Sequence, residues 1–201
     1  MDSVLDISYE PCPDARLVGV GEVWAAEHET CRKTDSGAGG MVGVGVHLRR
    51  DGYVGKFVVD DKEARGRVAS GMEVAGRCFI QHWTGAGVGF EEMLSEQQGL
   101  LPDLAPWPQC WDMSDGLGNA EHVDPDAHRS FAVWLAKKGH EGVSRGWWFL
   151  FPRHGVAVEL CHGCWVSWDG RVAPHCSAVP RVAEGDRLVS ASADARRSAA
   201  R

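Results

Sequence analysis

Alternation of apolar and polar residues predicts a β-hairpin in the first third of the chain. Apolar residues take every second position from 42 to 48, and a second apolar segment, VGKFVV, covers residues 54–59. The two segments are separated by Asp51-Gly52, a dipeptide typical of two-residue hairpin turns. We therefore expect two antiparallel strands joined at this turn.

The period of the apolar positions changes after Asp60, and this change predicts helices. An apolar residue now recurs every three or four positions, which is the spacing of one helix face: Ala64, Val68, Met72, Ala75 and Phe79. Asp60 and Asp61 precede this stripe as an N-cap and a first-turn charge would. The glycine-rich segment 84–89 ends the helix, and FEEMLSEQQGLL predicts a second, short helix that ends at Gly99.

The remainder of the chain predicts short strands joined by turns. The proline-rich segment LPDLAPWPQCW, residues 101–111, is expected to be a loop or an edge. After Asn119 the apolar segments are short and are bounded by glycine or charged residues, namely RSFAVWLA, GWWFLFP, VAVELC, CWVSW, HCSAVP and RLVSAS. Many short strands at regular spacing favour a sandwich or a barrel.

Charge and composition narrow the classes of partner. The 201 residues carry a formal net charge of −7, which argues against binding dominated by nucleic-acid phosphates, although a local basic groove remains compatible with it. No apolar run is long enough to span a membrane, and the acidic start lacks a signal-peptide pattern. We expect an intracellular protein, cytoplasmic or nuclear, in which most of the seven cysteines are thiols.

Two histidines and one aspartate form a candidate metal site. His122 and Asp124 are two residues apart, so on a strand they would share one face. His175 follows 175 − 122 = 53 residues later, after four strand-like segments, about the length a jelly roll needs to return to a facing strand. Two imidazoles and one carboxylate leave positions open on the metal and suit Fe(II), whereas a structural zinc site closes all four.

These residues resemble a known family, the Fe(II)/2-oxoglutarate-dependent dioxygenases. The HxD motif is His122-Val123-Asp124, the distal histidine is His175, and Arg187 within GDRL follows as a basic residue. This ending is similar to that of the prolyl-hydroxylase-like branch, and the TET/JBP-like branch also uses HxD and a distal histidine. GWWFLFP and CHGCWVSWDGR resemble the middle strands of the family. The resemblance covers about residues 115–192.

The resemblance implies an α+β, mainly β fold built on a double-stranded β-helix, or jelly roll. We expect a single domain over residues 1–201. A poorly patterned segment would cover residues 1–40, the hairpin and supporting helices 41–114, the jelly-roll catalytic core 115–192, and a flexible tail 193–201.

The resemblance also implies the chemistry of the site. His122, Asp124 and His175 would hold Fe(II), and 2-oxoglutarate and O2 would react there, with ascorbate as a further reductant. Arg187 would hold the far carboxylate of 2-oxoglutarate, since a guanidinium binds a carboxylate by two hydrogen bonds. Further positions complete the predicted site, namely Arg181 as a second candidate for that anchor, Asn119 as a cosubstrate contact, and Trp111 and Asp112 as substrate-binding wall residues.

Other interpretations of the same residues stay open. Asp126 and His128 are alternative ligands to the HxD pair. The CHGC motif, residues 161–164, is either a zinc or redox site or a pair of cysteines flanking a turn at Gly163. The whole chain could also be a non-catalytic, cupin-like or zinc-stabilised binding module.

The substrate is not determined by the sequence. A protein side chain such as proline, a methylated nucleobase and a free small molecule all remain candidates. The acidic charge does not favour nucleic acid.

Overall fold

The computed structural model describes most of the predicted core. Described residues are 6–10, 17–19, 38–49, 54–57, 62–100, 102, 106–108, 110–124, 128–136, 146–179, 188–193 and 197–198. All structural statements below concern these residues.

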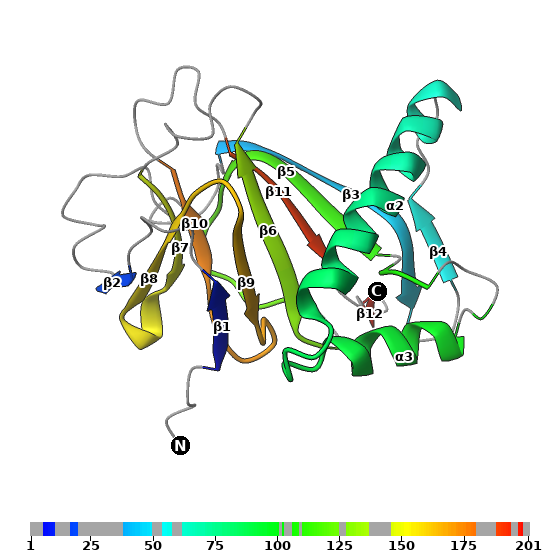
Figure 1. Ribbon diagram of the computed structural model, residues 1–201. Coiled ribbons are helices and arrows are strands. Elements are labelled where there is room, and N and C mark those ends of the chain that lie inside the picture. Colours follow the sequence, from blue (N-terminus) through cyan, green and yellow to red (C-terminus); the bar gives the residue numbers. More distant parts are fainter. Residues whose placement is uncertain are drawn as a thin grey trace.

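A large β-sheet forms the centre of the molecule (Figure 1). Its hydrogen-bonded order is β1-β9-β6-β11-β5-β3-β12, and β4 adds to β3. All described pairs in this sheet are antiparallel except β12 with β3. The strands are β1 (Ile7–Glu10), β3 (Ala38–Arg49), β4 (Val54–Phe57), β5 (Cys110–Gly118), β6 (Ser130–Ala136), β9 (Cys164–Trp168), β11 (Leu188–Ala193) and β12 (Arg197–Ser198).

A smaller antiparallel sheet faces part of the large one. Its order is β10-β7-β8-β2. The strands are β2 (Leu17–Gly19), β7 (Trp147–Phe151), β8 (Val156–Leu160) and β10 (Cys176–Ala178), and the 3-10 turn η1 (Pro152–His154) joins β7 to β8. An aromatic core fills the space between the two sheets, where Trp134 from the large sheet meets Phe149 from the small one with ring centroids 5.4 Å apart.

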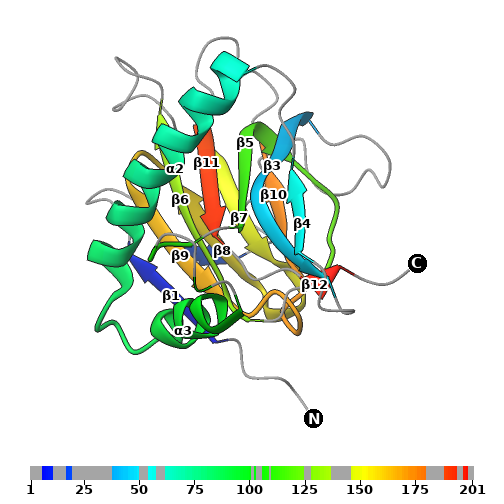
Figure 2. The ribbon, with the colours of Figure 1, turned by 90° about the vertical axis from the view of Figure 1, so that its right-hand side faces the viewer.

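Two helices cover the other face of the large sheet (Figures 1 and 2). They are α2 (Lys62–Trp83) and α3 (Phe90–Leu100). The apolar stripe of α2 ends in Phe79, which is fully buried and packs edge-on against Trp111 of β5 at 4.7 Å between ring centroids. The molecule is therefore layered as helices, large sheet and small sheet, with a core in each of the two spaces.

The two cores explain why β6 reads as almost continuously apolar. Phe131 and Val133 belong to the core beneath the helices, whereas Ala132 and Trp134 belong to the core between the sheets. A strand covered on both faces has no solvent-exposed face that would require polar residues. Its side chains still point alternately to the two faces.

Most of the predicted elements are confirmed. The hairpin is present as β3 and β4, although its turn lies outside the described residues. Both helices are present, and all six segments predicted after Asn119 contain strands. The expectation of a mainly β fold is confirmed by the two antiparallel sheets.

Three expectations about the fold were incomplete. The poorly patterned first 40 residues contribute β1 and β2, which pair with β9 and β8 at sheet edges. Residues 110–118 form the long strand β5, although 110–111 were expected to be a loop or an edge and no element was expected at 112–118. Within the segment 193–201, predicted to be a flexible tail, the described residues are Ala193, which ends the central strand β11, and 197–198, which pair with β3.

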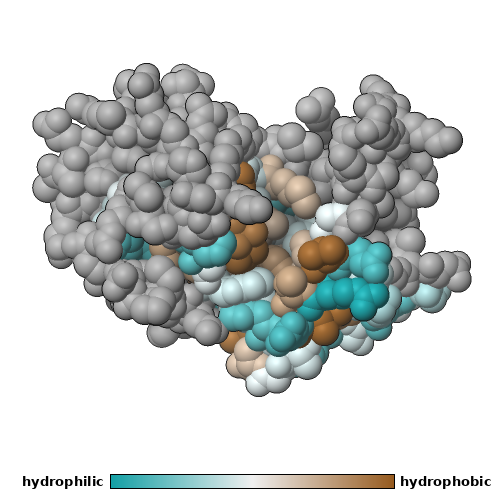
Figure 3. All heavy atoms as spheres, turned by 45° about the horizontal axis from the view of Figure 1, so that its top comes forward, coloured by the Kyte–Doolittle hydropathy of each residue, from teal (hydrophilic) through white to brown (hydrophobic). Residues whose placement is uncertain are grey.

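A shallow apolar groove lies between α2 and the large sheet. Val74 and Leu135 are exposed there, and Phe79 and Trp165 also line it. Figure 3 shows apolar residues gathered in a hollow on the upper side of the molecule.

None of the helices in the described part of the chain combines the length and the apolar character needed to cross a membrane.

Candidate metal centre

A pair of backbone hydrogen bonds brings the two histidines together. The amide of His122 donates to the carbonyl of His175 and the amide of His175 donates back, both at 3.0 Å. This isolated antiparallel bridge lies just before β10 and outside the named strands. The two rings consequently stand side by side, with centroids 4.5 Å apart, although 53 residues separate them in sequence (175 − 122).

Asp124 completes the group. Its Oδ1 lies 3.4 Å from Nε2 of His122, and its Oδ2 lies 3.2 Å from Nε2 of His175. The ligand atoms of all three residues are within 4.8 Å of one another. Two ligands on adjacent positions of an ion, each about 2.1 Å from it, would be separated by roughly 3 Å. The spacing of the carboxylate and each imidazole therefore fits a shared metal ion.

The backbone sets the tautomer of both histidines. Nδ1 of His122 is 2.8 Å from the carbonyl of Ala120, and Nδ1 of His175 is 2.9 Å from the carbonyl of Ala173. A carbonyl only accepts, so each Nδ1 carries the proton and donates. On each ring Nε2 is then the atom left to bind a metal, and both Nε2 atoms face Asp124.

The electrostatics of the group keep Asp124 ionised. Burial acts to raise the pKa of this carboxyl, but hydrogen bonds and positive charge from His122 and His175 outweigh burial and hold the pKa well below its ordinary value. An ionised carboxylate is the form that binds a cation. The side chain of His175 is only 3% exposed and that of His122 is 38% exposed, so the group opens toward solvent on the His122 side.

The three residues lie in the wall of a cavity between the sheets. One part of its wall is aromatic and apolar, from Trp134, Trp147, Phe149, Leu160 and Trp168. The other part is polar and comes mainly from β5 and β11, namely Asp112, Ser114, Asn119, Ser177, Ser190 and Ser192. Trp168 and Phe149 pack on His175 at 5.3 and 5.2 Å between centroids, which fixes the orientation of that ring.

The predicted strand geometry differs from the observed one. His122 is held by a single bridge, and Asp124 lies outside any strand, where its amide donates to the carbonyl of Gly170 at 2.9 Å. The two side chains meet because the loop after β5 is bonded at both positions, to His175 and to Gly170. The period of a strand is not the cause.

Of the predicted contact residues, two line the cavity, Asn119 and Asp112, and one does not, Trp111. Asn119 lines the cavity, but its Oδ1 accepts the amide of Ser177 at 2.6 Å and so ties β5 to β10. Asp112 also lines the cavity and is 5% exposed. Trp111 is the neighbour of Asp112 on β5 and therefore points to the other face, where it is fully buried against α2 and away from the cavity. The expected wall position of Trp111 is thus not where the structure places it.

Both predicted cosubstrate anchors, Arg181 and Arg187, lie outside the described residues. The described part of the cavity wall contains neither lysine nor arginine. The assignment of the anchor therefore stays a prediction.

The alternative ligands are separate from the group. His128 pairs through Nε2 with Glu96 of α3, and Asp126 lies outside the described residues. In the CHGC motif, Cys161 takes part in a disulfide while Cys164 is a buried thiol, and burial raises the pKa of that thiol to about 12. Gly163 between them has φ of 78° and turns the chain from β8 to β9, as the turn interpretation predicted.

Sequence reasoning overlooked two residues at the site, Trp168 and Gly170. Trp168 lines the cavity, and its buried indole N–H has no acceptor among the described residues. Gly170 binds the amide of Asp124. The residues DGR after the segment CWVSW indicate a turn, but the contact of this turn with a segment 46 residues earlier (170 − 124) has no sequence signal.

The comparisons with known proteins show a likeness among solved structures. No family model and no curated protein matches the chain. Among solved structures, NgTET1 in complex with 5mC DNA matches with a TM-score of 0.59 and 11% sequence identity, over 94% of this chain and 72% of that one. At this identity the likeness concerns the fold, so this chain has a fold similar to that of NgTET1.

Proposed function

We propose that the protein is an Fe(II)- and 2-oxoglutarate-dependent dioxygenase that oxidises a C–H bond of its substrate. The observation that carries the proposal is the group of His122, Asp124 and His175, two imidazoles and one carboxylate with both Nε2 atoms directed at the carboxylate. This donor set suits Fe(II) and leaves coordination positions open. The fold likeness to NgTET1 supports it, since the TET/JBP-like branch of the family that the sequence resembles also uses HxD and a distal histidine.

The double-stranded β-helix belongs to this proposal. Two antiparallel sheets face each other, and the metal-binding group lies between them at the end of the small sheet. In this arrangement β5, β6, β9 and β11 would form one wall of the jelly roll and β7, β8 and β10 the other. The likeness to NgTET1, which spans nearly the whole chain, supports this assignment.

The residues that line the cavity would have different roles in this reaction. His122, Asp124 and His175 would hold the metal, which when bound supplies the activation of O2 coupled to 2-oxoglutarate decarboxylation. The aromatic wall, with Trp134, Trp147 and Phe149, would keep water from the reacting groups. The indole N–H of Trp168, which lacks an acceptor in the described part of the chain, offers a hydrogen bond to an oxygen of a molecule bound in the cavity.

Arg187 is our proposed anchor for the far carboxylate of 2-oxoglutarate, with Arg181 as the second candidate. Arg187→Ala should raise the 2-oxoglutarate concentration needed for half-maximal turnover by roughly tenfold or more and leave metal affinity unchanged, because the hydrogen bonds lost would be charge-assisted and would hold the end of 2-oxoglutarate that does not bind the metal. Steady-state kinetics at varied 2-oxoglutarate measure this. The same effect in Arg181→Ala and none in Arg187→Ala would move the anchor.

The substrate is proposed only as a class containing an oxidisable C–H bond. NgTET1 was solved with 5mC DNA, which keeps a methylated nucleobase among the candidates, beside a protein side chain and a small molecule. The net charge of −7 does not favour a long nucleic acid. The second candidate function is a metal-binding module without turnover, which the same three residues would also allow.

The deciding experiment measures succinate formed from 2-oxoglutarate. Anaerobically purified protein is incubated with Fe(II), ascorbate and pools of peptides, nucleosides or metabolites, and mass spectrometry follows succinate and substrates gaining oxygen. His122→Ala, Asp124→Ala and His175→Ala should each abolish turnover, whereas His154→Ala, outside the cavity in η1, should not. Equal turnover in all variants would refute the site. Metal analysis that finds bound metal, without succinate in any pool, would favour the binding module.

A further inference from the structure

The carboxylate of Asp124 rests against the turn that follows β9. The amide of Asp124 donates to the carbonyl of Gly170 at 2.9 Å. A Cβ at position 170 would lie 2.5 Å from Oδ2 of Asp124 and 3.0 Å from its Cβ. Gly170 is buried, and its φ is not in the left-handed region. Glycine is therefore required here for space and not for backbone conformation.

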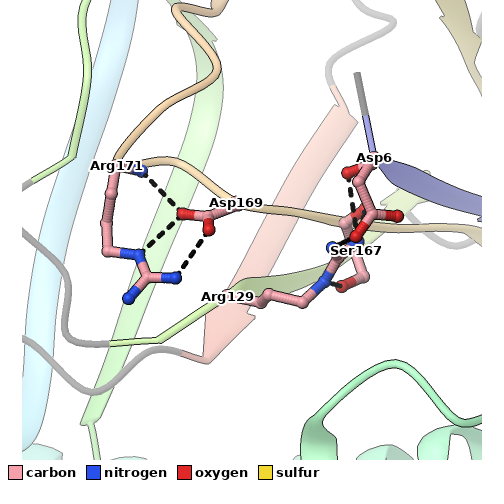
Figure 4. Close-up of polar contacts among 5 residues, drawn as sticks. All are labelled: Asp6, Arg129, Ser167, Asp169 and Arg171. Carbon is pink, nitrogen blue, oxygen red and sulfur yellow. Dashed lines mark hydrogen bonds and ion pairs between the residues drawn. The ribbon is translucent and has the colours of Figure 1, made fainter. Parts of the chain in front are cut away.

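The turn is itself locked by an ion pair (Figure 4). Oδ1 of Asp169 accepts hydrogen bonds from the backbone amide and Nε of Arg171 at 3.1 and 2.7 Å, and Oδ2 accepts one from Nη2 at 2.6 Å. These bonds hold the pKa of Asp169 below its usual range. The side chain of Asp169 is 20% exposed, which limits screening by solvent. Two side chains two residues apart thus fasten the backbone on both sides of Gly170.

The same turn also reaches the second histidine. The carbonyl of Asp169 accepts the amide of Ala173 at 3.0 Å, and the carbonyl of Ala173 in turn accepts Nδ1 of His175 at 2.9 Å. One short segment, residues 169–173, therefore contacts two of the three metal-binding residues by hydrogen bonds. It positions the carboxylate through Gly170 and sets the tautomer of His175 through Ala173.

We propose that residues 169–173 are the positioning element of the metal centre and that Arg171 is a positioning residue that acts through Asp169. This inference rests on the proposed metal-binding function, and it adds residues that touch neither metal nor substrate. Loosening the turn would let Asp124 and the ring of His175 move apart. Positioning contacts behind metal ligands typically contribute about 10- to 100-fold to metal affinity.

The test measures Mn(II) affinity, which does not depend on turnover. Free Mn(II) is followed by electron paramagnetic resonance during titration of wild type, Arg171→Gln, Asp169→Asn and Gly170→Ala. We expect about 10- to 100-fold weaker binding in each, and a smaller loss in Arg171→Lys, which keeps the charge without the planar fork. The visible spectrum of bound Co(II) should also change in these variants, since the ligands are displaced.

Matched controls come from α2. Arg77→Gln removes an exposed arginine in a similar ion pair, to Glu73 at 2.9 Å, and Gly71→Ala adds a Cβ with nothing within 4 Å. Both should bind Mn(II) as wild type does. Melting temperatures in EDTA separate positioning from folding, because Arg171→Gln changes a side chain that is 45% exposed and should leave them nearly unchanged.

The outcomes distinguish the two proposals. Wild-type affinity and an unchanged Co(II) spectrum in Arg171→Gln and Asp169→Asn would overturn the positioning element while the metal site stands. Weakened Mn(II) binding in those variants supports it even if no oxygenase turnover is ever found. If Gly170→Ala does not fold, the two turn variants decide the matter. A wild-type protein that binds no Mn(II), Co(II) or Fe(II) would overturn both proposals.

Discussion

At the scale of single residues, the site depends on backbone atoms as much as on side chains. His122 and His175 each donate Nδ1 to the carbonyl two residues earlier, at 2.8 and 2.9 Å. The same kind of local hydrogen bond thus orients both imidazole rings. Residue types at three positions were enough to predict a facial triad, but the tautomers follow from loop conformations that no sequence pattern describes.

Burial separates the cysteines by reactivity. Cys164 is fully buried with a thiol pKa raised to about 12, whereas Cys78 is exposed on α2. Only a thiolate attacks iodoacetamide, so at pH 8 Cys78 should be alkylated within minutes and Cys164 should remain unmodified in the folded protein. Peptide mass spectrometry measures this, and both should react in concentrated urea. Rapid labelling of Cys164 without denaturant would contradict its burial.

At the scale of elements, β5 is a strand that the sequence pattern does not predict. The strand contains Asp112, Ser114 and two glycines, a composition typical of loops. Its register nevertheless places it between β3 and β11, with Ser114 opposite Ser190 and their hydroxyl groups 2.6 Å apart. The polar face of β5 lines the cavity while Trp111 faces the helices. Because these polar side chains line the cavity, β5 lacks the alternation of apolar and polar residues by which strands are recognised in a sequence.

Two of the three glycines in helix α2, Gly71 and Gly76, have opposite expected responses to substitution. A Cβ added at Gly71 would have nothing within 4 Å, so Gly71→Ala should stabilise the protein by about 0.5–1 kcal/mol through helix propensity. At Gly76 the added Cβ would lie 2.5 Å from the ring of Trp107, so Gly76→Ala should destabilise by about 1–3 kcal/mol through overpacking. Chemical denaturation monitored by circular dichroism measures both, and equal effects would contradict this packing.

At the scale of the whole molecule, one arginine links the segment before the first strand to the large sheet. Arg129 donates Nε to Oγ of Ser167 at 3.1 Å and Nη2 to the carbonyl of Ser167 at 3.2 Å, and it also pairs with Asp6 before β1 (Figure 4). Its side chain is only 13% exposed. Arg129 therefore joins the start of β6, β9 and the start of the described chain.

Arg129→Ala should destabilise the fold more than Asp6→Asn. The first change leaves buried acceptors on Ser167 without their donor, at a cost of about 1–3 kcal/mol. The second change removes an ion pair whose acidic side chain is 77% exposed, worth roughly 0–1 kcal/mol. Urea unfolding curves of the two variants give the comparison, and a larger loss in Asp6→Asn would refute this order.

Metal binding should stabilise the whole protein, because its ligands come from segments on both sides of β6 to β9. With Mn(II) at a hundredfold excess over its Kd, the expected stabilisation is about 2.7 kcal/mol. In a protein of this size that corresponds to roughly 5–10 °C in melting temperature. Scanning calorimetry with Mn(II) and with EDTA measures the difference. Asp124→Ala should show none, and an equal rise in that variant would mean that the metal binds elsewhere.

The sequence by itself determined the hairpin, both helices, most strands of the second half and which three residues form the candidate metal site. Each of these follows from a local period or from the coordination chemistry of residue types at a recognisable spacing. Only the tertiary structure decided that β5 is a strand, that Trp111 faces away from the cavity, and that Gly170 supports Asp124. These three features depend on contacts between segments remote in sequence. Such contacts require no regular spacing of residue types along the chain, so no sequence pattern predicts them.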